Sequence, residues 1–126
     1  MKYLGIDFGN KRVGVAISDL NGGMAFPHSV ISNSSKLLRE IEKIIEKEKI
    51  ERIVIGESYD FVGEPNKIMR KIEEFKKLLE EKTKLTVFFE SEFLTSREAE
   101  QIIGKNEMHD ASAATIILQS YLDRLK

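Results

Sequence analysis

The sequence predicts a mixed α/β fold in which helices pack on a five-stranded sheet. Two short apolar runs, residues 3–6 and 12–17, flank a Gly/Asn link, an arrangement typical of a β-hairpin. A third β-like run follows the turn sequence NGG, and strand-like and helix-like segments then alternate to the end of the chain. This order predicts an antiparallel three-strand meander followed by parallel strands.

The first half of the chain supports these elements in turn. The third strand is expected from about Met24 to Ile31. Pro27 marks it as an edge strand or an interrupted one, because proline cannot donate a hydrogen bond to the sheet. The segment SNSSK offers N-caps for a helix that begins near Ser35, and apolar residues then recur at helical spacing with Lys and Glu between them.

The second half alternates strands and helices. RIVIG (52–56) is an all-apolar run that suits a buried strand, and LTVFFE (85–90) predicts the next strand. Between them, Pro65 can occupy the first turn of a helix. Residues 95–98 match a capping box for a short helix, and Asp110 is predicted to cap the last helix.

Composition limits the class of protein. A chain of 126 residues predicts one domain, residues 1–126. Its net charge of −1 provides no global attraction to nucleic acid, so such a partner would need a local basic patch or bound cations. The absence of cysteine excludes disulfides, thiolate zinc sites and cysteine nucleophiles. The start of the chain does not resemble a signal peptide and no run reaches membrane-spanning length, so we expect a cytoplasmic protein without a membrane partner.

Several acidic residues follow predicted strands. Asp7 ends the first strand, Glu57 follows RIVIG, and Glu90 or Glu92 ends the last strand. The first strand is expected to lie centrally, between the meander and RIVIG, and ligands gather at the carboxyl ends of parallel strands. The last helix starts at Asp110, and its first turn could reach the same edge. Acids that are far apart in sequence are therefore expected to converge.

A cluster of carboxylates has a clear chemical use. Carboxylates that lie close together resist ionising at the same time unless cations compensate their charge. Hard divalent cations such as Mg²⁺ or Mn²⁺ prefer oxygen ligands. Two such ions, roughly 3.5–4 Å apart, can activate water and stabilise the leaving oxygen of a phosphodiester. The alternative interpretation of Asp7 alone is a residue that braces the turn before Gly9.

Four segments resemble the YqgF (RuvX) family, whose members are described as pre-16S rRNA nucleases and as Holliday-junction-resolvase-like proteins with an RNase H-like fold. LGIDFGNKRVGVAISD resembles the opening motif of that family and is the most specific of the four. HDASAATIILQSYLD closely resembles its closing motif, and ESEFLTSREAE resembles its D-E-R-[LF]-[ST]-T-x-E-A segment. RIVIGESYDFVGEP resembles its I-V-V-G-L-P-x-N-x-D-G segment in outline.

The resemblance implies an RNase H-like sheet with helices on both faces and a metal-dependent endonuclease that binds two Mg²⁺ or Mn²⁺ ions. Its implied substrate is structured RNA, at the 5′ side of precursor 16S rRNA, or branched DNA, with ribosomal particles as a further partner. Carried over by position, the catalytic and metal-binding carboxylates are Asp7, Glu92 and Asp110. The implied phosphate contacts are Lys11, Arg12, Thr95 and Ser96.

The chain departs from the family pattern at two strand ends. The D-E-R of the family reads Ser91-Glu92-Phe93 here, which removes an acid and an arginine. Glu57 stands where the family has an apolar residue, and we hypothesise that it is an additional or replacement metal ligand. Two other function classes stay open: a non-catalytic RNA-binding or ribosome-binding module, and a nucleotide-binding protein related to actin-like ATPases, which need two such domains.

Overall fold

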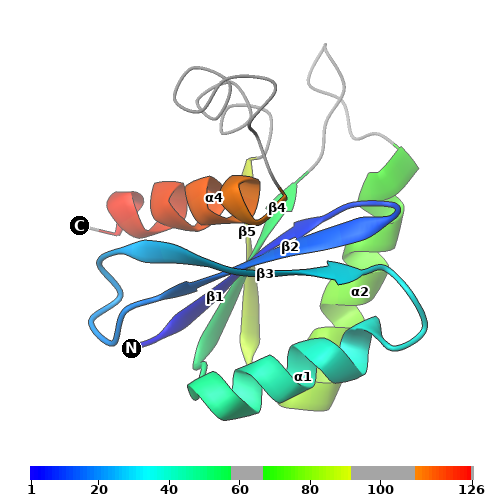
Figure 1. Ribbon diagram of the computed structural model, residues 1–126, viewed down its shortest axis with the longest axis horizontal. Coiled ribbons are helices and arrows are strands. Elements are labelled where there is room, and N and C mark those ends of the chain that lie inside the picture. The colour runs from blue at the N-terminus through cyan, green and yellow to red at the C-terminus, as the bar shows by residue number, and fades with distance from the viewer. Residues whose placement is uncertain (58–66, 92–109, 126) are drawn as a thin grey trace.

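The computed structural model describes residues 1–57, 67–91 and 110–125, which form one five-stranded sheet and three helices. The strands are β1 (Tyr3–Phe8), β2 (Arg12–Ser18), β3 (Ala25–Ser32), β4 (Arg52–Glu57) and β5 (Thr86–Ser91). The helices are α1 (Leu37–Glu48), α2 (Lys67–Thr83) and α4 (Asp110–Arg124). Figure 1 shows the helices on the two faces of the sheet, with α4 on one side and α1 and α2 on the other.

The order of the strands is β3-β2-β1-β4-β5. Strands β1, β2 and β3 pair antiparallel, whereas β4 pairs parallel to β1 and to β5. The predicted meander, the central place of β1 and the parallel strands beside it are therefore confirmed. Three strands, β1, β4 and β5, thus present their carboxyl ends along the same edge of the sheet.

The edge strand β3 carries the irregularity that its proline predicts. Val15 of β2 is opposite Ser29, but the next residue, Ala16, is opposite Pro27, so His28 is an extra residue in β3. Such a bulge lets a residue without an N–H sit in the strand, because the ladder is already interrupted there. Helix α1 begins at Leu37, two residues later than expected, and no side chain caps it.

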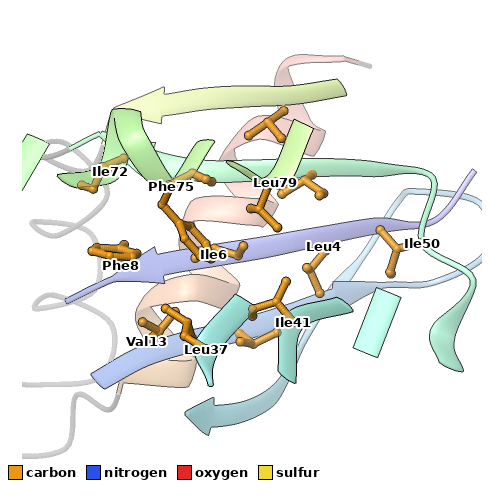
Figure 2. Close-up of a cluster of buried hydrophobic side chains, with 14 of the residues drawn as sticks. Leu4, Ile6, Phe8, Val13, Leu37, Ile41, Ile50, Ile72, Phe75 and Leu79 are labelled. Atoms are coloured by element: carbon orange, nitrogen blue, oxygen red, sulfur yellow. The ribbon is translucent and has the colours of Figure 1, made fainter. Parts of the chain in front are cut away.

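One face of the sheet forms the larger core (Figure 2). Leu4, Ile6 and Phe8 of β1 point to this face, where α1 and α2 supply the opposing side chains. Helix α1 contributes Leu37 and Ile41, and α2 contributes an apolar stripe at helical spacing, Met69, Ile72, Phe75 and Leu79. Alternate residues of β1 therefore belong to this core, as the two-residue period of a strand requires.

The opposite face is covered by α4 alone among the described helices. Its side of the core contains Tyr3, Ala16 and Val54 from the sheet, which pack against Ala114, Ile117, Leu118 and Leu122 of the helix. Tyr121 also packs here, with its ring 6.1 Å from that of Tyr3 and stacked 5.5 Å from that of Phe88, and burial raises the pKa of its hydroxyl.

Gly5 determines how closely α4 approaches the sheet. A Cβ atom at this position would lie 2.7 Å from the Cβ of Leu118 and 3.2 Å from the carbonyl oxygen of Ala114. Any larger residue would therefore push the helix away from β1 or force the strand to shift.

Within the described residues, no helix combines the length and the apolar character that crossing a bilayer requires.

We predict that Gly5→Ala lowers the free energy of unfolding by about 1–3 kcal/mol, the usual cost of overpacking a closed contact. Gly23→Ala is the matched control, because a Cβ there meets no atom within 4 Å. Urea denaturation of both variants measures the difference. Equal stabilities would show that α4 can move without cost.

Candidate active site

Asp7 lies near the end of the central strand, on the face that α4 covers. It is opposite Gly14 of β2 and is half-buried. Its neighbours Ile6 and Phe8 point into the α1/α2 core, and side chains alternate along a strand, so Asp7 shares its face with Tyr3 and Gly5. The side chain predicted to be catalytic therefore points away from the larger core.

Helix α4 runs antiparallel to β1 and brings its first turn toward Asp7. Tyr3 packs against Tyr121, whereas Gly5, further along β1, lies against Leu118 and Ala114. Asp7 is two residues beyond Gly5, about 6–7 Å along a strand. Asp110 is four residues before Ala114, about 6 Å along a helix. The two steps have the same direction and nearly the same length, so Asp7 and the start of α4 lie at the same end of the molecule.

The remaining predicted residues of this site are outside the part of the chain that the structure describes. Glu92, Thr95 and Ser96 fall within residues 92–109, as does the predicted helix that follows Thr95. Asp110 is described as the first residue of α4 through its backbone only. Among the described side chains, no three acids or histidines gather as a metal site. The backbone therefore brings two of the three predicted ligand residues, Asp7 and Asp110, to the same end of the sheet.

Arg12 is the basic residue that the sheet places nearest to Asp7. It is the first residue of β2, and the alternation with buried Val13 puts it on the α4 face. Asp7 is opposite Gly14, so Arg12 is its diagonal neighbour, with about 7–8 Å between Cβ atoms. Lys11 precedes it at the exposed tip of the hairpin. Both predicted phosphate contacts of the hairpin thus lie beside Asp7.

Asn33 holds the hairpin tip, a role that the sequence analysis missed. Its side-chain Nδ2 donates a 2.7 Å hydrogen bond to the carbonyl oxygen of Gly9, and its backbone N–H donates to the carbonyl of Lys11 at 2.9 Å. Gly9 is needed because a Cβ there would lie 2.5 Å from the carbonyl oxygen of Arg12. An asparagine directly after an edge strand was the available signal, since asparagine side chains commonly bond to nearby backbone.

Glu90, the alternative acid at the end of β5, is held by α4. It is 5% exposed, accepts a 2.7 Å hydrogen bond from the Ser120 hydroxyl and forms an ion pair with Arg124. Arg124 in turn lies over the ring of Tyr121. These contacts give Glu90 a structural role, fastening the C-terminal half of α4 to the sheet. This favours Glu92, the residue selected by the resemblance, as the metal ligand of this segment.

Glu57 lies on the other face of the sheet from Asp7. Ile53 and Ile55 of β4 belong to the α1/α2 core and Val54 to the α4 core, so Glu57 continues the row of Ile53 and Ile55. The register of β1 with β4 places Gly56 beside Asp7. A site shared by Glu57 and Asp7 would require the glutamate to reach around the end of β4.

The described geometry fits a site for hard cations and phosphate. Asp7 supplies a half-buried carboxylate, and carboxylate oxygens are ligands that Mg²⁺ and Mn²⁺ prefer. The backbone of Asp110 begins the helix that approaches it. Arg12 and Lys11 supply positive charge beside these acids, and phosphate oxygens are their usual partners. The arrangement suits binding of a phosphodiester at the edge of the sheet.

A central strand that carries Asp7, a meander on one side and parallel strands on the other define an RNase H-like protein. The fold superposes on the RuvC of Thermus thermophilus solved with a Holliday junction substrate, with a TM-score of 0.65 at 14% identity, covering 99% of this chain and 96% of that one. A ROK hexokinase from the same organism matches with a TM-score of 0.53 and 21% identity, but only 39% of its chain is covered, against 85% of this one.

The sequence places the chain within one family. The model of the RuvX family, described as Holliday junction resolvase, matches residues 1–124. A protein of Nitratidesulfovibrio vulgaris named "Putative pre-16S rRNA nuclease" is 38% identical over 133 aligned positions, covering 98% of this chain and 94% of the relative. The chain therefore belongs to the RuvX family, which confirms the resemblance seen in its motifs.

We predict that Asn33→Ala loosens the hairpin tip without unfolding the protein. The change removes one neutral hydrogen bond, worth about 0.5–1.5 kcal/mol, and leaves the core untouched. Amide hydrogen exchange at residues 9–12 should become faster, while exchange in β4 stays the same. Ser35→Ala, an exposed change two residues away, is the control and should alter neither segment.

We also predict that Glu90→Gln and Glu92→Gln separate structure from activity. Glu90→Gln should cost about 1–2 kcal/mol of stability, because the ion pair with the largely exposed Arg124 is weakened. It should leave nuclease activity per folded molecule within about twofold, whereas Glu92→Gln should abolish that activity with little loss of stability. The reverse pattern would make Glu90 the ligand.

Proposed function

We propose that the protein is a metal-dependent endonuclease that hydrolyses phosphodiester bonds in structured RNA and processes the 5′ end of precursor 16S rRNA. The observation that carries the proposal is the approach of the start of α4 to Asp7, beside Arg12, at the carboxyl edge of the sheet. Membership of the RuvX family and the names of the relatives support the same activity.

In this proposal Asp7, Glu92 and Asp110 are the residues that would hold the metal ions. Bound there, two Mg²⁺ or Mn²⁺ ions would activate water and stabilise the leaving oxygen, giving 5′-phosphate and 3′-hydroxyl ends. The three acids come from β1, from the chain after β5 and from α4, so only the folded protein brings them together. Packing of α4 on Gly5 fixes the distance between the first and the last of them.

The basic residues of the hairpin orient the substrate. Arg12 and Lys11 bind phosphates next to the scissile bond, and the hydrogen bonds of Asn33 keep the hairpin in one conformation before RNA arrives. Thr95 and Ser96 are proposed to contact phosphates from the segment after β5. Because the chain has a net charge of only −1, these local contacts and the bound cations must supply the attraction to RNA.

A second candidate is the resolution of branched DNA, favoured by the family description and by the superposition on RuvC. The Nitratidesulfovibrio vulgaris relative named for precursor 16S rRNA is 38% identical to this chain, whereas RuvC is 14% identical. RNA is therefore the preferred substrate in this proposal. The proposed place of action is the cytoplasm, on free precursor RNA or on ribosomal particles. A nucleotide-dependent kinase is disfavoured, because this chain corresponds to 39% of the hexokinase it superposes on.

We predict that Asp7→Asn lowers Mg²⁺- or Mn²⁺-dependent cleavage of a precursor 16S rRNA fragment by more than about 100-fold, since losing only a residue that hydrogen-bonds to a metal ligand already costs about 10–100-fold. Gel analysis of 5′-labelled RNA measures cleavage and the position of the new end. Asp19→Asn is the matched control. Asp19 accepts hydrogen bonds from the N–H groups of Gly23 and Met24, which lower its pKa, and it lies at the opposite end of β1.

Three outcomes decide between the candidate functions. Cleavage that needs a divalent metal and Asp7, and that is faster on precursor RNA than on branched DNA, supports the proposal. Faster cleavage of branched DNA would favour the resolvase. RNA binding that survives EDTA, with no cleavage under Mg²⁺ or Mn²⁺, would identify a non-catalytic module.

A further inference from the structure

A hollow of about 420 Å³ lies between the tip of the β1–β2 hairpin and helix α2. Phe8, Asn10 and Asn33 line it from the hairpin side, and Lys71, Phe75 and Leu78 line it from the helix. Its volume falls within the range of about 300–1,000 Å³ that is typical of sites for small molecules. Neither the family motifs nor the proposed nuclease chemistry assigns it a role.

The hollow lies on the other side of β1 from the candidate active site. Phe8 directly follows Asp7, and alternation along the strand points the two side chains to opposite faces. The hairpin tip with Lys11 and Arg12 lies next to both places, because Asn10 belongs to the same turn. A strand of nucleic acid bound by the hairpin can therefore contact the hollow and the acidic site at neighbouring positions.

The side chains of the hollow match a nucleobase. Phe8 and Phe75 form its apolar base, with ring centroids 5.1 Å apart, and Leu78, 45% exposed, is an apolar residue at its rim. The amide groups of Asn10 and Asn33 can hydrogen-bond to the edge of a base, as asparagine commonly does. Asn33 is already fixed by its bond to Gly9, so less conformational entropy is lost on binding.

The charges around the hollow favour a nucleotide over a neutral ligand. Lys71 lies on α2 at the rim, and Lys11 follows Asn10 at the exposed tip of the hairpin. These cations can bind the phosphates on either side of an inserted base. Glu74, also at the rim, can accept a hydrogen bond from an exocyclic amino group of the base.

We propose that the hollow binds one unpaired nucleotide of the RNA, with the base against Leu78 and the asparagines and a flanking phosphate on Lys71. The identity of the polymer rests on the proposed function, whereas binding itself does not require cleavage. The hollow would then recognise a bulged or single-stranded nucleotide beside the cleavage position. Structured RNA is commonly recognised through such unstacked bases.

The test compares two RNA stem-loops that differ only at one bulged position, which carries a base or an abasic linker. Binding is measured by fluorescence anisotropy in EDTA, so that loss of cleavage cannot affect the result. The wild-type protein should bind the RNA with the base about tenfold more tightly, since stacking and hydrogen bonds to one base add to the affinity. Leu78→Ala and Asn10→Ala should each reduce this preference to threefold or less.

Two further variants separate base contacts from phosphate contacts. Lys71→Ala should weaken binding of both RNAs by about the same factor and leave the preference for the base unchanged. Lys77→Ala is the control, because Lys77 is exposed on α2 but does not line the hollow, and this change should leave the preference for the base unaltered. Circular dichroism confirms that each variant is folded, which is expected because Leu78 and Asn10 are exposed.

Equal binding of the two RNAs by the wild type would overturn the inference, as would a preference that Leu78→Ala and Asn10→Ala leave intact or that Lys77→Ala also removes. Failure of the proposed function has a different result. In that case Asp7→Asn and the wild type would cleave equally or not at all, while the preference for the base could still be present and still depend on Leu78.

Discussion

The contact between α4 and Gly5 of β1 is the constraint on which the arrangement of the candidate site depends. Because Gly5 has no Cβ, Leu118 and Ala114 lie directly on the strand. The helix is thereby fixed in height and direction over β1, and its first residue is carried toward Asp7. At the other end of the helix, Glu90 fastens Ser120 and Arg124 to β5. These two contacts, both away from the first turn of α4, thus set the backbone position of Asp110.

Much of this architecture could be predicted from the sequence, because the strands and helices alternate and each has a clear apolar period. Pro27 correctly indicated an edge strand and also its irregularity. The side of the sheet on which an acid lies was harder to predict. Glu57 is the last residue of β4 and Asp7 is the last but one of β1, and only the pairing of the two strands shows that these acids lie on opposite faces. The partners of Glu90 come from a helix 30 and 34 residues away, a distance at which sequence spacing gives no signal.

The two faces of the sheet divide the work of the protein. The α1/α2 face contains the larger cluster of aliphatic and aromatic side chains, which stabilises the fold, and Glu57 lies at the edge of this face. The α4 face has a smaller apolar cluster, flanked by Asp7, Arg12 and Glu90. The superposition on RuvC at 14% identity shows that a very different sequence can adopt this fold.

The bulge at Pro27 has a consequence for the behaviour of the protein at high concentration. A regular edge strand exposes a row of N–H and carbonyl groups that can pair with another molecule and begin aggregation. In β3 this row is interrupted by a residue without an N–H and by the additional His28 beside it. Phe26 and Val30, both substantially exposed on this strand, are therefore presented on an edge that is poorly shaped for sheet extension. We therefore expect the irregular edge to disfavour pairing between copies of the chain.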